Sequence, residues 1–199
     1  MGRSDCRVKT LKRQRRLFRA AEKELSKKEY ERLLQAAKKK PRLYLLMQTI
    51  CATGIRVSEH RFITVEAAKR GSAEVKLKGK LRTVFLPSQL CRMLLKYAKQ
   101  CGIKSGSIFI TSTGKPLDRS RIWAEMKKLC EAAGVSREKV FPHNLRHLFA
   151  RTYYAMEKDI VRLADLLGHS SVNTTRIYTM ESGSTHRRQI EKMRLCHIM

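Results

Sequence analysis

The chain has 199 residues, with 44 lysines and arginines against 17 aspartates and glutamates, which gives a formal net charge of +27. This length suits one main folding unit with a core of its own, not two large domains. So large an excess of positive charge repels itself unless a polyanion balances it, so nucleic acid is the first partner to consider. No segment has the roughly 18 to 20 consecutive apolar residues of a membrane span, so we expect a cytoplasmic protein without a membrane partner.

Cysteine and histidine spacing gives no sign of a metal site. The six cysteines are spread singly, without a C-x-x-C pair or a Cys/His cluster at zinc-ligand spacing. His143 and His147 stand four residues apart on a predicted helix, but an H-E-x-x-H arrangement and a third ligand are absent. We therefore expect reduced thiols, no metal and no cofactor.

The N-terminal segment predicts a basic arm. Residues 1–20 carry eight lysines and arginines against Asp5 alone, which is too polar a composition to bury a face. We predict a flexible arm or linker over residues 1–22 whose arginines lie on phosphates, followed by a main domain over 23–180 and a tail over 181–199.

The first half of that domain contains two predicted helices and a hairpin. Ser26 and Glu29 have capping-box spacing at the start of a helix, and Pro41 can begin a second helix that Gly54 ends. Two short extended runs follow, over 73–77 and 81–86, joined through Lys78-Gly79-Lys80. This pattern predicts a β-hairpin with lysines at its tip.

The second half is mainly helical. Apolar spacing predicts helices over 88–100 and 118–133, separated by a short strand at 108–110 and a turn. Further helices are expected from Pro142 to about residue 156, from Asp159 to Gly168, and near 186–194. The fold class is therefore α+β, mainly helical, with a small antiparallel hairpin at one edge.

Four polar clusters lie at predicted helix ends or turns, where a scaffold presents chemically active groups. They are Arg56 after a helix stop, the lysines of the hairpin tip, the His143-x-x-Arg146 pair, and Gly168-His169 followed by Tyr178. His143 and Arg146, three apart on a helix, project to the same side, which suits a phosphate ligand. Each cluster alone is weak evidence, but four in this order are strong evidence.

These clusters resemble the tyrosine recombinases of the phage-integrase family. The resemblance lies in segments 53–59 (Thr-Gly-Ile-Arg-Val-Ser-Glu), 143–147 (His-Asn-Leu-Arg-His), 166–170 (Leu-Leu-Gly-His-Ser) and 174–178 (Thr-Thr-Arg-Ile-Tyr). It implies the catalytic fold of that family and a metal-independent DNA strand transferase that cleaves and rejoins DNA at specific sites through a 3′-phosphotyrosyl intermediate. The match runs from about residue 26 to the C-terminal helix.

The resemblance assigns a role to each matching position. Arg56 and Arg146 correspond to the two arginines that grip the scissile phosphate, and Tyr178 to the nucleophile. His143 corresponds to the histidine that accepts the tyrosine proton, and His169 to a second histidine that hydrogen-bonds the phosphate. The family's hairpin lysine protonates the leaving 5′ oxygen; Lys78 aligns better with it, and Lys80 is the alternative.

The partner implied is double-stranded DNA. We predict DNA contacts from six basic residues, Arg13, Arg15, Arg16, Lys80, Arg82 and Arg176. The tail resembles the family's exchanged C-terminal element, which favours a homo-oligomer, a tetramer, on DNA; a monomer in free solution is equally consistent. The bacterial cytoplasm and nucleoid would be its location.

Two other functions fit the same fold. A catalytically silent DNA-binding module would show a lost arginine, histidine or tyrosine, and none is lost here. A type IB topoisomerase-like enzyme shares the chemistry, but the Gly168-His169 pattern and the tail favour a recombinase. Relatives carry an N-terminal helical domain, whereas fewer than thirty residues precede the pattern here, so a fragment, a natural truncation and a minimal form stay open.

Overall fold

The structure, a computed structural model, describes residues 24–77, 79–176 and 192. The chain forms two compact units, Met1–Ala150 and Arg151–Met199, with the boundary inside one helix. The described part of the chain contains no helix with the length and apolar character needed to cross a membrane.

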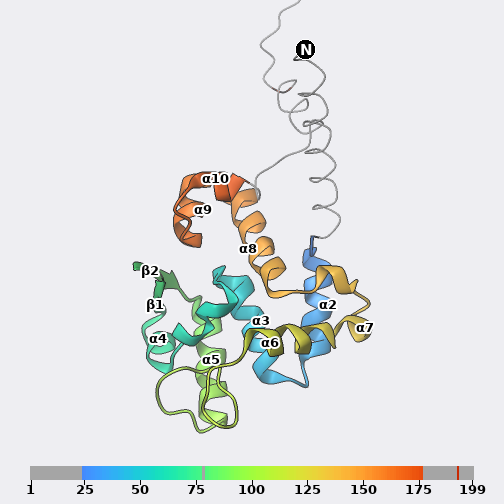
Figure 1. The fold of residues 1–199 in the computed structure, drawn as a ribbon, viewed down its shortest axis with the longest axis vertical. Helices are drawn as coiled ribbons and strands as arrows, with labels where there is room; N and C mark the ends of the chain where they lie inside the picture. Colours follow the sequence, from blue (N-terminus) through green and yellow to red (C-terminus); the bar gives the residue numbers. More distant parts are fainter. Residues whose placement is uncertain (1–23, 78, 177–191, 193–199) are drawn as a thin grey trace, which may run out of the picture. The chain divides into compact units, whose positions relative to one another are not determined.

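The first unit is mostly helical and carries one two-stranded sheet (Figure 1). In chain order its elements are α2 (Lys27–Ala37), α3 (Pro41–Thr53), the 3₁₀ helix η1 (Val57–Phe62), α4 (Val65–Arg70), β1 (Ser72–Leu77), β2 (Lys80–Phe85), α5 (Ser88–Gln100), α6 (Arg119–Lys127), α7 (Cys130–Ala133), the 3₁₀ helix η2 (Arg137–Lys139) and the first part of α8 (Pro142–Glu157). The predicted α+β class, mainly helical with a small hairpin, is confirmed.

Helix α2 begins at the predicted capping box. The Ser26 hydroxyl accepts from the Glu29 amide at 3.2 Å, and the Glu29 carboxylate accepts from the Ser26 amide at 2.8 Å. Each side chain thus satisfies an amide that the helix itself leaves without a partner. Glu29 also pairs with Lys139 of η2 at 3.0 Å, which ties the start of α2 to a distant segment.

Helix α3 begins and ends where the sequence predicts. Pro41 is its first residue, and Gly54 ends it in the left-handed conformation with φ of 65°. A residue without a Cβ adopts this conformation at little cost, which stops the helix cleanly. The chain therefore leaves α3 at a fixed angle just before Arg56.

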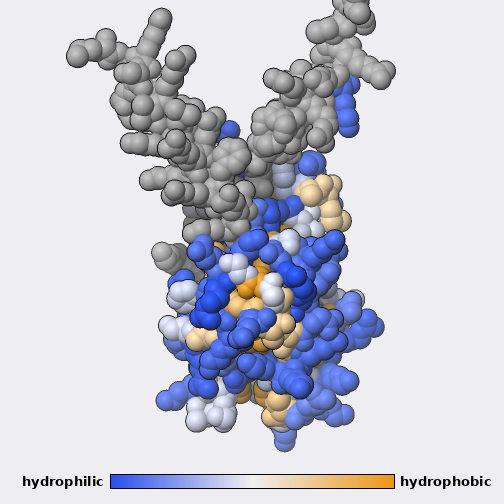
Figure 2. Space-filling view, turned by 90° about the vertical axis from the view of Figure 1, so that its right-hand side faces the viewer, coloured by the Kyte–Doolittle hydropathy of each residue, from blue (hydrophilic) through white to orange (hydrophobic). Residues whose placement is uncertain are grey.

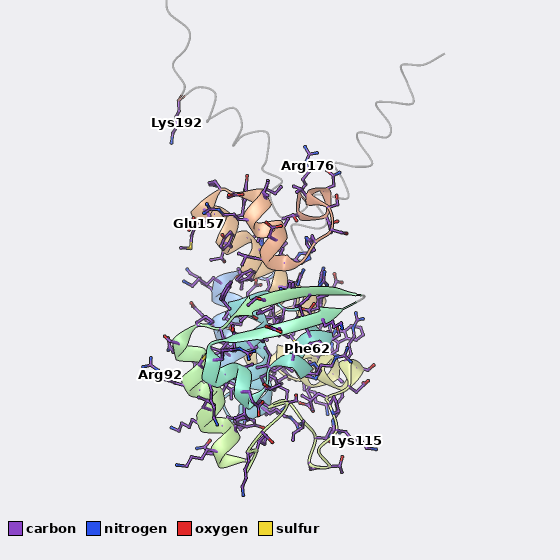
Figure 3. All side chains as sticks on the ribbon, turned by 90° about the vertical axis from the view of Figure 1, so that its left-hand side faces the viewer. Phe62, Arg92, Lys115, Glu157, Arg176 and Lys192 are labelled. Carbon is purple, nitrogen blue, oxygen red and sulfur yellow. The ribbon has the colours of Figure 1, made fainter. Side chains whose placement is uncertain are left out.

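The predicted hairpin is confirmed: both strands begin one residue earlier than expected, and β2 also ends one residue earlier. The strands are antiparallel, in a register that pairs Ser72 with Phe85 and Leu77 with Lys80. Alternate residues point inward: Ala73, Val75 and Val84 are buried, whereas Leu81 and Phe85 are exposed. Figure 3 shows the two strands side by side, with Phe62 of η1 labelled close to them.

One core joins these elements. It collects buried side chains from α2, α3, α5 and the segment after α5, including Leu33, Met47, Ile50, Leu94 and Phe109, all with no exposed surface. Helix α2 packs on α3 and α7, and α3 packs on α5. The elements that carry Arg56 and Arg146 are therefore fixed to a common interior.

Two sequence predictions in this unit were wrong. The helix expected over 118–133 is divided into α6, capped by Asp118, and the short α7, because α7 packs on α2 and this contact outweighs the continuous helical pattern. The strand expected at 108–110 is absent, and the structure has only isolated bridges from Ser107 to Thr64 and from Ile110 to Pro116. A three-residue apolar run indicates burial but does not by itself specify a strand.

The second unit contains the end of α8, then α9 (Ile160–Leu167) and α10 (Val172–Thr175). As predicted, Asp159 caps the start of α9 by accepting from two amides, and Gly168 ends it with φ of 63°. The basic helix expected near 186–194 lies outside the described residues, apart from residue 192. The face in Figure 2 is mostly hydrophilic, with small apolar areas between the hydrophilic side chains, in keeping with the high content of basic residues.

We predict that Ser26→Ala lowers the free energy of unfolding by about 1 kcal/mol, because the Glu29 amide loses its acceptor. Urea unfolding followed by circular dichroism measures the change. Ser26→Asp, which keeps an oxygen at the cap, should stay close to the parent protein. Equal stability of the alanine variant would contradict a stabilising role for this cap.

Candidate active site

A cavity of about 580 Å³ opens among η1, α6 and the start of α8 in the first unit. Its walls are formed by Ile55, Arg56, Val57, Ser58, Arg119, Ser120, Trp123, Phe141, Pro142, His143 and Arg146. Three of the residues that sequence reasoning selected as catalytic therefore meet here, from segments almost ninety positions apart in the chain. Three arginines give the cavity a strongly positive character.

Arg56 lies directly before η1, two residues after the glycine that ends α3. Its backbone amide donates to Glu59 Oε2 at 2.8 Å, and its Nη1 donates to Glu59 Oε1 at 2.9 Å. The side chain stays 40% exposed. Both the backbone and the guanidinium of Arg56 are thus held by one carboxylate, and the residue also lines the cavity.

Glu59 is the buried acceptor behind this arginine. It has no exposed surface, and besides Arg56 it accepts from Arg82 Nη2 of strand β2 at 2.5 Å. A buried carboxylate is tolerated only when charges and hydrogen bonds compensate for the water it has lost, and two guanidiniums provide this. Burial and the nearby charge of Arg56 lower the pKa of Arg82, whereas Glu59 opposes that shift, and the arginine remains charged.

Arg146 comes from the second turn of α8 and is only 2% exposed. Its Nη1 donates to the carbonyl of Gly54 at 2.6 Å. Carbonyls at a helix C-terminus have no partner inside the helix, and they carry the negative end of its dipole. The end of α3 therefore anchors Arg146, just as Glu59 anchors Arg56.

His143 precedes Arg146 by three residues and has an exposed side at the cavity. Partial desolvation lowers the pKa of His143 below its ordinary value of 6.5, and the charges of Arg146, Arg56 and Arg119 lower it further. The imidazole is therefore neutral at pH 7 and able to accept a proton. The ring of His147 packs against it edge to face, with 4.4 Å between the centroids.

His60, the residue after Glu59, has a structural role. It is buried, its Nδ1 contacts the carbonyl of Val57, and its ring packs against Phe109. Burial lowers the pKa of His60, so it is neutral at pH 7. Within residues 24–77 and 79–176, no three histidine, cysteine, aspartate or glutamate side chains gather closely enough to hold a metal ion.

The remaining predicted residues are placed as follows. His169 belongs to the second unit, where its Nδ1 lies 2.9 Å from the hydroxyl of the fully buried Thr175. Arg176 is exposed at the end of α10, and Lys80 begins β2. Residues Lys78, Tyr178, Arg13, Arg15 and Arg16 lie outside the described part of the chain.

Sequence reasoning missed several residues that support the site. No role was predicted for Glu59, although a glutamate three residues after a capping position commonly accepts a hydrogen bond from the backbone amide there. The carbonyl of Gly54 carries no sequence signal at all, because it is a backbone group. Arg119 and Trp123 reach the cavity from a helix whose sequence pattern says nothing about which face meets α8.

We predict that Thr175→Val destabilises the second unit by about 1 kcal/mol, because His169 Nδ1 loses its hydroxyl partner. The ¹⁵N shifts of the His169 ring should move toward a mixture of tautomers, which nuclear magnetic resonance measures. Thr175→Ser keeps the hydroxyl and should leave those shifts unchanged. Identical ring shifts in the valine variant would show that the contact does not select a tautomer.

Comparison with known proteins finds related sequences and related folds. The model of the phage integrase family matches residues 23–184. The tyrosine recombinase XerH of Campylobacter jejuni is 36% identical over 141 residues, which cover 68% of this chain and 40% of the relative. The chain thus spans less than half the length of this relative.

Two solved structures are similar in fold. A crystal structure of XerA recombinase has a TM-score of 0.71 and 29% identity, over 87% of this chain and 64% of that one. XerH site-specific recombinase bound to difH substrate, in a pre-cleavage complex, has a TM-score of 0.71 and 27% identity, over 84% of this chain and 53% of that one. With the family match covering well over half of its residues, the chain belongs to the phage integrase family, with a tyrosine-recombinase catalytic fold.

Proposed function

We propose that this chain is the catalytic part of a site-specific DNA recombinase that cleaves and rejoins strands through a covalent tyrosine–phosphate bond. The observation that carries the proposal is the meeting of Arg56, Arg146 and His143 at one cavity, in a chain of the phage integrase family. The chain covers about half of the XerH recombinase that was solved with its difH substrate, so the activity of the whole protein is part of this proposal.

Arg56 and Arg146 would bind the two non-bridging oxygens of the scissile phosphate. Each is held from behind, by Glu59 and by the Gly54 carbonyl, so little reorganisation is needed when negative charge increases in the transition state. Arginine suits this role because its planar fork is permanently charged and can bind two oxygens.

Tyr178 would attack the phosphorus while the bond to the 5′ oxygen breaks. The products are a 3′-phosphotyrosyl bond and a free 5′ hydroxyl, so the energy of the phosphodiester is kept for rejoining. The phenol proton passes to neutral His143, and the leaving oxygen takes a proton from the hairpin lysine, for which we favour Lys78 over Lys80. His169 would hydrogen-bond the phosphate through Nε2, the tautomer that results if the Thr175 hydroxyl donates to Nδ1.

Recombination between two duplexes requires four strand cleavages, so four copies with one nucleophile each would assemble on DNA. The basic arm with Arg13, Arg15 and Arg16, together with Lys80 and Arg176, would neutralise phosphates along the duplex. Because the substrate is DNA, we infer that the protein works at the nucleoid in the bacterial cytoplasm.

We predict that the parent protein forms a denaturation-resistant adduct with DNA and that Tyr178→Phe does not, because only the attacking oxygen has been removed. The probe is a pool of nicked duplexes with randomised sequence, incubated with the full chain in chelator. Covalently captured duplexes are recovered and sequenced, and the enriched duplex then serves for all rate measurements.

The phenylalanine variant should bind the enriched duplex as tightly as the parent, which serves as the control for folding. An adduct with Tyr178→Phe, or none with the parent protein across the pool, would contradict the proposed function. Relaxation of a supercoiled plasmid without exchange of strands would favour the topoisomerase-like alternative.

We predict that the adduct forms at a constant rate near neutral pH and that this rate falls below pH 6.5. The pKa of His143 is lowered, so the imidazole stays in its proton-accepting form at pH 7 and is lost as a base only as pH falls through that lowered pKa. Single-turnover rates of adduct formation measured from pH 5 to pH 8 test this.

The matched variant is His143→Gln, which should be slower and should lose the acidic limb of the profile. An acidic limb that persists unchanged in the glutamine variant would rule out His143 as the proton acceptor.

A further inference from the structure

Strand β2 carries Arg82, whose guanidinium contacts Glu59, the same carboxylate that binds Arg56. Arg82 stands opposite Val75 in the sheet register, on the inward face of the hairpin that also presents Val84. Its side chain is only 14% exposed, and its Nη2 lies 2.5 Å from Glu59 Oε2. Arg82 therefore extends from the hairpin to the carboxylate that holds Arg56.

Glu59 links this strand to the start of η1 through three separate donors. Its Oε2 accepts from Arg82 and from the Arg56 amide, and its Oε1 accepts from the Arg56 guanidinium. Because the carboxylate has no exposed surface, water cannot replace a lost donor. Without Arg82, Glu59 would keep only its hydrogen bonds from Arg56. The carboxylate could then move, and the Arg56 guanidinium would move with it, away from the cavity.

We propose that Arg82 is a positioning residue for strand cleavage: through Glu59 it fixes the guanidinium of Arg56 in the orientation that receives the phosphate. The inference rests on the proposed function and adds a residue that does not touch the substrate. This role differs from the sequence-based expectation that Arg82 binds DNA, because in the structure the guanidinium forms an ion pair with the buried carboxylate of Glu59.

Measurements of DNA affinity and of the cleavage rate distinguish an arginine that contacts DNA from an arginine that positions Arg56. A DNA contact would release counterions, so Arg82→Gln would reduce the slope of log affinity against log salt by about 0.9. A positioning residue would leave that slope and the affinity unchanged and would slow adduct formation, on the order of 10- to 100-fold. Arg82→Lys keeps the charge and should recover part of the rate.

Slow cleavage by Arg82→Gln could result from a misplaced Arg56 or from a displaced hairpin lysine, and a modified substrate distinguishes the two causes. When sulfur replaces the bridging 5′ oxygen, the leaving thiolate needs no proton, so the loss of a general acid is bypassed. This substrate should restore cleavage by Lys78→Ala but not by Arg82→Gln. Restored cleavage by Arg82→Gln would overturn the route through Arg56.

The control is Arg92→Gln, which removes one exposed arginine from α5, where Figure 3 shows its side chain at the surface. It should cleave at the parent rate. A reduced salt slope for Arg82→Gln, or cleavage by Arg82→Gln at the rate of Arg92→Gln, would overturn the proposal.

A stability cycle without DNA tests the contact even if the proposed function fails. Arg82→Gln and Glu59→Gln should each lower the melting temperature, and the double variant should lose less than the sum of the two shifts, because the uncompensated charge is then gone. Additive shifts would show that the two side chains are not coupled, and would overturn the proposal independently of any cleavage result.

Discussion

Guanidinium groups that lie close together repel one another when no anion is bound between them. In the first unit, hydrogen bonds from each arginine to an acceptor of the protein offset this repulsion. Arg56 is held by the buried Glu59, and Arg146 by the carbonyl that ends α3. Neither anchor is accessible to solvent in the way a surface ion pair is, so salt screens them little. The fold can thus keep a highly positive cavity assembled without its substrate.

Partial burial and the same positive surroundings keep the histidine beside these arginines neutral, as its proposed role as a base requires. A nearby carboxylate would stabilise the imidazolium, whereas here partial desolvation and then the neighbouring positive charges lower the pKa of His143. The buried carboxylate of Glu59 binds Arg56 and Arg82. The proposed binding of phosphate and the proposed acceptance of a proton are therefore compatible within one small cavity.

Local sequence signals predicted much of this fold because they act through neighbouring atoms. The Ser26 cap, the Pro41 start and the Gly54 stop depend on short-range hydrogen bonds and backbone conformation, and all three are confirmed. The break after α6 depends on the packing of α7 against α2, which no local pattern records. The apolar run at Ile108 indicates burial, which is shared by strands and by irregular segments. The cavity residues Arg56, His143 and Arg146 came from motif resemblance, whereas their anchors, Glu59 and the Gly54 carbonyl, became evident only in three dimensions.

The register of the hairpin also limits how its length can vary. Arg82 faces inward and its neighbour Leu81 faces outward, because side chains alternate along a strand. If the pairing at the tip is kept, inserting a single residue between Lys80 and Leu81 would turn every later side chain of β2 over, presenting leucine to Glu59 and arginine to solvent. Insertions or deletions that preserve the site should therefore involve two residues at a time, so that the arginine stays on the inward face of a longer or shorter hairpin.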